Sequence, residues 1–130
     1  MGNSNQGPVQ RPWSITNVGA SGAQATATQA SAGTGFKNVL TGFWVSVIGA
    51  GAVTAEKITF VCRDGATGAG TVLFTFDVDL SLAAAGNGWQ GGLSGMWIPG
   101  TAATVMTFES SDPTDTDIAT SINAWGQVSA

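Results

Sequence analysis

The chain has 130 residues, of which 43% are hydrophobic and only 9% are charged, and its net charge is −4. This length fits one domain with a core of its own. With no histidine and one cysteine, these residues offer neither an internal disulfide nor a Cys/His zinc site. The basic residues are too scattered for the cationic surface that nucleic-acid binding requires: Arg11, Lys37, Lys57 and Arg63.

The charged share is well below the usual value of about 25%. Gly, Ala, Ser and Thr take the place of charged residues, and a surface of small neutral side chains packs against neighbouring subunits without desolvating many charges. The composition therefore favours a subunit of an oligomer or lattice.

Residues 1–12 are polar and rich in glycine and proline, which predicts an extended N-terminal arm ahead of a β-sandwich domain over residues 13–130. The segment lacks the basic and apolar regions of a secretory signal, and Gln6 stands where the myristoylation pattern requires Ser or Thr. We expect synthesis in the host cytoplasm without a lipid anchor. The longest apolar stretch, residues 43–53, is well short of the roughly 20 residues that span a bilayer, so no membrane partner is expected.

From Trp13 onward, short β-branched and aromatic runs alternate with glycine-rich breaks, and no stretch keeps a 3.6-residue apolar period. This pattern predicts an all-β domain. The expected strands cover residues 13–17, 24–30, 38–48, 56–63, 71–80, 88–98, 103–109 and 118–128. The simplest arrangement of eight such strands is an antiparallel jelly-roll-like β-sandwich.

Alternation along the strands predicts which side chains face the core. Ile58, Phe60 and Cys62 share one face of the fourth strand, so Cys62 is expected to be a small buried hydrophobic residue, without a histidine to activate it. The fifth strand is expected to bury five residues on one face: Val72, Phe74, Phe76, Val78 and Leu80.

Two groups of carboxylates could in principle form a catalytic or a metal site. Asp77 and Asp79 share a strand face, but neighbouring polar residues are typical of a solvated face, and no catalytic residue or cofactor is predicted. The chain is not expected to be an enzyme. Oxygen-rich loops such as the one with Asp112, Asp115 and Asp117 can hold Ca²⁺, but this loop lacks the glycine and distal glutamate of a calcium loop. A solvated turn is favoured and no metal is predicted, although cation binding stays open.

Five tryptophans in so short a chain require an explanation. Tryptophan anchors subunit interfaces, and an exposed tryptophan on a sandwich can also stack on sugar rings. Trp44 is in phase with Ser46 and Ile48, and Trp125 lies on the more polar face of its strand. Interface packing is favoured over glycan contact. The interface candidates are Arg11, Trp13, Trp44, Trp89, Trp97 and Trp125.

Four segments resemble small structural proteins of tailed bacteriophages, of the capsid decoration, head-fibre or minor capsid kind. They are VLTGFWVS at residues 39–46, GTVLFTFDVDL at 70–80, AAGNGW at 84–89 and SINAWGQV at 121–128. From the start of the first segment to the end of the last, the resemblance covers about 90 residues. The tryptophan-rich, histidine-free composition and the aspartate loop depart from that pattern, so no attachment site is carried over.

The resemblance implies a jelly-roll sandwich, often trimeric, that attaches to a capsid or tail surface. The expected function is therefore that of a virion structural protein, most simply a capsid decoration or minor capsid component. Its expected partners are copies of itself, as a homotrimer, and the major capsid protein or other virion subunits. The alternative is a carbohydrate- or receptor-binding module of a phage fibre or spike.

Overall fold

The computed structural model of the chain describes residues 11–49, 55–80 and 88–130. Within these ranges the chain forms eight strands, one at each of the expected places. They are β1 (Arg11–Val18), β2 (Thr26–Gln29), β3 (Lys37–Gly49), β4 (Lys57–Asp64), β5 (Thr71–Asp79), β6 (Gly88–Pro99), β7 (Met106–Ser110) and β8 (Ile118–Ser129). The described residues include no helix that is long and apolar enough to cross a membrane.

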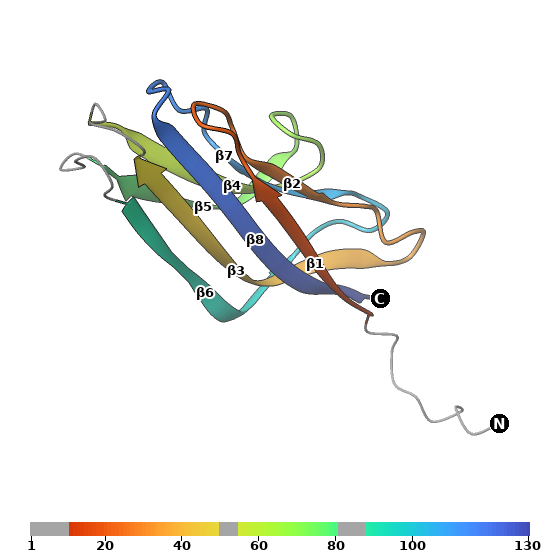
Figure 1. Cartoon of the computed structure of the whole chain (residues 1–130). Coiled ribbons are helices and arrows are strands. Elements are labelled where there is room, and N and C mark those ends of the chain that lie inside the picture. The colour runs from red at the N-terminus through yellow and green to blue at the C-terminus, as the bar shows by residue number, and fades with distance from the viewer. Residues whose placement is uncertain (1–10, 50–54, 81–87) are drawn as a thin grey trace.

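The strands pack as two antiparallel four-stranded sheets (Figure 1). Sheet A has the order β1-β8-β3-β6, and sheet B has the order β2-β7-β4-β5. The antiparallel pairs β1 with β8, β2 with β7, β3 with β6 and β4 with β5 are successive rungs of one long folded-back ribbon. Alternate rungs lie in opposite sheets, which is the jelly-roll arrangement. The predicted fold is confirmed.

The core lies between the sheets and is filled by the inward side chains of alternating strand positions. Its centre is aromatic. The ring of Phe43 from sheet A stacks 4.9 Å from that of Phe76 in sheet B, and Phe76 stacks 5.0 Å from Phe60. Each large side chain buried in this way contributes roughly 1.5–3 kcal/mol. The predicted inward face of β4 is confirmed, because Ile58, Phe60 and Cys62 are all fully buried.

The predicted core face of β5 is wrong at one end. Val72 is 48% exposed, while Leu73 packs against the core. The cause is a β-bulge: Phe74 pairs with Cys62 but Val72 pairs with Arg63, so the strand carries one extra residue between these pairs. The bulge reverses the facing of every residue before it.

Two strand ends also differ from expectation. β7 begins at Met106 rather than at residue 103, because Ala103 has a positive φ of 59° in the preceding turn. At the other end of the chain, Arg11 and Pro12 already belong to β1 and pair with Val128 and Gln127. Residues 1–10 of the expected arm lie outside the described residues, as does most of the glycine-rich loop before β6.

Candidate functional site

The outward side of sheet A carries one charged side chain among the described residues, Lys37 at the first position of β3, opposite Ser129. The rest of that side is uncharged from one edge strand to the other. We call the following residues the sheet A face: Ser14, Thr16 and Val18 of β1; Ala119, Ser121, Asn123 and Trp125 of β8; Trp44, Ser46 and Ile48 of β3; Gly88, Gln90, Gly92 and Ser94 of β6. Their side chains are small, amide or apolar. Such a face can be covered without desolvating a charge.

Trp44 lies in the middle of the sheet A face and is 49% exposed. In the strand register it stands between Gly92 of β6 and Asn123 of β8. Gly92 has no side chain, so nothing from that position covers the indole. The next cross-strand pair is closed by a hydrogen bond between the hydroxyls of Ser46 and Ser121. The predicted facing of Trp44 with Ser46 and Ile48 is confirmed.

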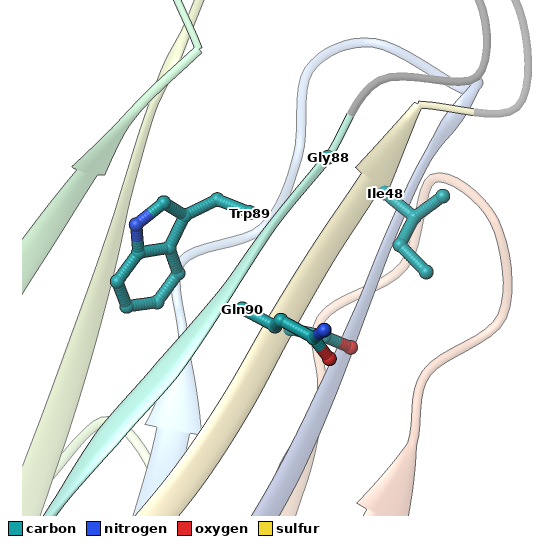
Figure 2. Close-up of a pocket in the computed structure, with 5 residues that line it drawn as sticks. Ile48, Gly88, Trp89 and Gln90 are labelled. Carbon is teal, nitrogen blue, oxygen red and sulfur yellow. The ribbon is translucent and has the colours of Figure 1, made fainter.

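A shallow hollow of about 210 Å³ lies beside this tryptophan, where β3 meets β6. Ser46, Ile48, Gly88, Trp89 and Gln90 line it. Figure 2 shows Ile48 and Gln90 on one side of β6 and the Trp89 indole on the other. The hollow is smaller than the roughly 300–1,000 Å³ of small-molecule sites, so it is a surface depression rather than a ligand-sized pocket.

Trp125 also faces outward from sheet A, but its side chain is partly buried because the indole packs against Gly42 of the neighbouring strand β3. A Cβ added to Gly42 of β3 would come within 2.5 Å of the indole of Trp125. Gly42 therefore provides the space in which the ring rests on backbone. The indole of Trp125 therefore packs against the backbone of β3, whereas the indole of Trp44 projects from the sheet.

Trp13 and Arg11 lie on β1 and are tied to their own chain. The indole of Trp13 is turned toward the core and rests on Gly126 of β8, where an added Cβ would come within 2.5 Å of it. The guanidinium of Arg11 lies 5.7 Å above the ring of Phe36, a cation–π contact. The structure therefore gives both residues intramolecular roles.

Trp89 and Trp97 lie on β6, an edge strand of sheet A. Trp89 is turned inward, with its ring 6.2 Å from that of Phe76, and is 40% exposed. Trp97 lies within the stretch where the register between β3 and β6 shifts, and it is more exposed. Its neighbours Met96 and Ile98 both pack against the core, so Trp97 faces outward. Of the predicted interface residues, Trp44, Trp97 and Trp125 therefore lie on the outward side of sheet A, whereas Trp13 and Trp89 are turned inward.

The outward side of sheet B carries charges, and they are paired. Lys57 of β4 lies with its Nζ 3.6 Å from Oδ2 of Asp77, and the hydroxyl of Thr59 donates a 2.6 Å hydrogen bond to Oδ1 of the same carboxylate. Asp77 therefore forms a solvent-exposed ion pair with the adjacent strand. An exposed ion pair of this kind contributes little to stability.

Glu109 of β7 has a partner that no neighbouring residue in the sequence indicates. Its carboxylate is 3% exposed and forms an ion pair with Arg63 on the adjacent strand. The loop after β4 folds over the pair: the amide of Gly68 donates to Glu109 at 3.3 Å, and Arg63 donates to the carbonyl of Gly70 at 3.0 Å. The separation of 46 residues hid this pair from sequence patterns.

The remaining candidates behave as structural groups. Cys62 is fully buried, and burial, with the nearby charge of Asp64, raises the pKa of its thiol to about 12. In the aspartate loop, the amide of Asp117 donates to Oδ1 of Asp115 at 2.9 Å, as in a solvated turn. Glu56 accepts hydrogen bonds from the amides of that loop. Among the described residues no three His, Cys, Asp or Glu side chains are grouped to hold a metal ion.

No protein-family model and no curated protein sequence matches the chain. Among solved structures, it is similar to infectious bursal disease virus, Gx strain, at 14% identity and a TM-score of 0.44, over 92% of this chain and 36% of that one. It is similar to broad bean stain virus at 11% identity and a TM-score of 0.37, over 94% and 86%.

A third similarity is to a family 11 carbohydrate-binding module from Clostridium thermocellum in complex with a β-1,3-1,4-mixed-linked tetrasaccharide. It has 8% identity and a TM-score of 0.36, over 95% of this chain and 92% of that one. The chain thus spans about a third of the bursal disease virus chain and nearly all of the module. At these TM-scores the similarities decide nothing about function, and the jelly-roll assignment rests on the strand order itself.

Proposed function

We propose that the protein is a non-enzymatic structural subunit of a virion, a capsid decoration or minor capsid component that binds neighbouring subunits through the sheet A face. The observation that carries this proposal is the absence of charge across that face together with the projecting indole of Trp44 at its centre. Covering such a face removes apolar area from water and strips no ion of its hydration.

The composition of the face fits an interface core with a polar surround. Trp44 supplies exposed apolar area at the centre, Ile48 supplies more at the end of β3, and the amides of Gln90 and Asn123 lie beside them. Aromatic residues at the centre of an interface commonly contribute 2 kcal/mol or more, whereas peripheral polar residues contribute little. We expect most of the binding free energy to come from Trp44.

The placement in a virion is supported by the resemblance of residues 39–46, 70–80 and 121–128 to phage structural proteins. These segments include β3, β5 and β8, so the resemblance involves both sheets. The proposed partners are the major capsid protein or other virion subunits and further copies of this chain. The trimer implied by the resemblance remains a prediction.

The test uses particles assembled without the protein, to which purified chain is added. Trp44→Ala should weaken binding to particles by about thirtyfold, the equivalent of about 2 kcal/mol. Thr75→Ala, an exposed position on the outward side of sheet B, is the matched control and should bind as the unchanged chain does. Equal particle binding by the Trp44 variant and the unchanged chain would contradict the proposal.

Glycan binding is the second candidate, favoured by the position of Trp44 between a glycine and an amide side chain. An open indole flanked by uncharged hydrogen-bonding groups is suited to a neutral sugar ring. Trp89 and Trp125, by contrast, lie against Gly91 and Gly42 of their own sheet. Replacing Asn123 or Gln90 by Ala distinguishes the two functions. It should abolish binding to immobilised glycans if the site holds a sugar, and should change particle binding only slightly if it holds a protein.

A further inference from the structure

β6 differs from the other three edge strands of the sandwich. β1 begins with Arg11 and Pro12, β2 has only four residues, and β5 carries Asp77 and Asp79. Charges, proline and short length are the features by which edge strands avoid pairing with other chains. β6 has 12 residues, carries no charge, and has its proline only at the last position. It is the edge on which a further strand is least opposed.

The side of the sandwich at β6 is also apolar. A hollow of about 200 Å³ lies between β6 and β5, and its lining is almost entirely hydrophobic: Phe43, Phe74, Phe76, Trp89, Gly92 and Leu93. Leu93 is 55% exposed. On the opposite side of the sandwich, β1 and the segment entering β2 are joined by a hydrogen bond from the Thr26 amide to Oδ1 of Asn17. The described residues leave the β5–β6 side open.

We propose that a second copy of this chain covers this side, with the two β6 strands paired antiparallel across a two-fold axis near Gly91. The register between β3 and β6 is unbroken from Gly88 to Ser94, and Gly91 is the middle of that regular stretch. Trp89 of each copy then lies opposite Leu93 of the other. Both residues are on the inward face, so the partner's Leu93 enters the apolar hollow.

Charge favours a second copy as the occupant. A two-fold axis sets each residue against a symmetry-related stretch of the same strand, and β6 has no charge to oppose itself. Self-pairing of β5 would instead bring Asp77 and Asp79 against carboxylates, and pairing with β1 would meet Pro12, which has no amide hydrogen.

The size of the contact predicts its strength. Seven paired residues span about 23 Å, and a sandwich side of about 20 Å including side chains gives on the order of 450 Å² per copy, near the lower limit of specific interfaces. The dimer should therefore dissociate on dilution. It also joins two sheet A faces into one continuous uncharged surface. The contact is made by the backbone edge of β6 and by the inward side chains of Trp89 and Leu93, so it extends the proposed function without depending on it. In combination with a three-fold contact it would give six copies.

A register-specific disulfide tests the proposal with purified chain. Trp89→Cys and Leu93→Cys chains are prepared separately, then mixed and oxidised. The mixture should give several-fold more covalent dimer than either variant alone, because identical introduced thiols would be about 13 Å apart along the paired strands, beyond disulfide reach. The native Cys62 should not interfere, since it is fully buried.

A second measurement uses the molecular mass in solution as a function of concentration. Leu93→Lys should shift the dimer to monomer, because the introduced ammonium group would have to be buried in the apolar hollow against Trp89 of the other copy. Thr28→Lys, an exposed position on β2 at the far edge of sheet B and outside the sheet A face, is the control and should leave the mass unchanged. Equal cross-linking in the mixture and in the single variants, or no effect of Leu93→Lys on mass, would overturn the two-fold contact. Neither measurement involves particles, so failure here is separate from failure of the proposed function.

Discussion

The two sheets of this sandwich lie face to face (Figure 1), and their outward sides differ in whether the side chains find partners within the chain. On sheet B, the ionic groups of Arg63 and Glu109 are paired beneath a loop that folds back over the strands. On sheet A, the face is uncharged and its central side chain, Trp44, is half exposed. Sheet B thus finds its interactions within the chain, whereas sheet A presents apolar area that only another molecule can cover.

This contrast implies that the two faces answer differently to substitution. Changes to the Arg63–Glu109 pair on sheet B should affect folding, because each group of the pair stabilises the other. Changes at the exposed Trp44 on sheet A should affect binding to other molecules while leaving the free energy of unfolding nearly unchanged. Variants that change the wrong property would break the comparison.

The largest effect on folding is expected for Glu109→Ala. The substitution leaves the half-buried guanidinium of Arg63 without its carboxylate, and breaking one partner of a buried pair costs about 3 kcal/mol or more. Urea denaturation measures the loss. The double variant Glu109→Ala with Arg63→Met should recover part of it, because the unpaired charge is then gone. A loss below about 0.5 kcal/mol would show that the pair is no more than a surface contact.

A smaller effect is expected for Gly42→Ala, which tests the packing of Trp125 on sheet A. The added Cβ would come within 2.5 Å of the indole, so the ring must move, at a cost of about 1–3 kcal/mol. The same substitution in a Trp125→Ala background should cost much less. Equal costs in the two backgrounds, measured by thermal unfolding, would mean that the ring does not constrain Gly42.

The core between the two sheets is tested by the pH dependence of stability that Cys62 confers. Its thiol has a pKa of about 12 in the folded chain against 9.0 for an ordinary thiol. As pH rises, the thiol of the unfolded chain therefore loses its proton before that of the folded chain. The free energy of unfolding is unaffected by this group below pH 9 and falls as pH rises from 9 toward 12. We expect a loss of about 1 kcal/mol by pH 10. Comparison with Cys62→Ala isolates the effect, and identical pH profiles would contradict it.

The smallest effects on folding are expected at exposed positions on either face. Trp44→Ser on sheet A and Asp77→Asn on sheet B should each change the free energy of unfolding by no more than about 0.5 kcal/mol. The two variants should nevertheless differ in particle binding, which only Trp44→Ser should reduce. If Trp44→Ser unfolded the chain instead, the residue would belong to the core and the sheet A face would lose its centre.

Much of the fold was predictable because strand patterns are local. Two-residue alternation placed Phe60 and Cys62 in the core and put Trp44 on one face with Ser46 and Ile48, and glycine-rich breaks separated the strands. The bulge in β5 was not predictable, because a single extra residue is visible only in the pairing with β4. Alternation therefore misplaced Val72.

The candidate site was predictable only in part. The sequence identified tryptophans as the residues of interest but could not rank them, because their exposure depends on residues from other strands. Gly42 lies under Trp125 although the two are 83 residues apart in the sequence, and Gly126 lies under Trp13 although the two are 113 residues apart. Trp44 projects because its neighbour on β6 is a glycine.

The sequence by itself determined the all-β class, the places of the strands and the low charge, since each follows from residue type and short-range order. Only the tertiary structure decided that the ion pairs gather on sheet B, that Trp44 and its uncharged neighbours share the sheet A face, and that β6 is an edge. The physical reason is that these features arise from strand pairing between distant segments. Hydrogen bonds of the sheets and contacts of the core select that pairing, and no local pattern encodes it.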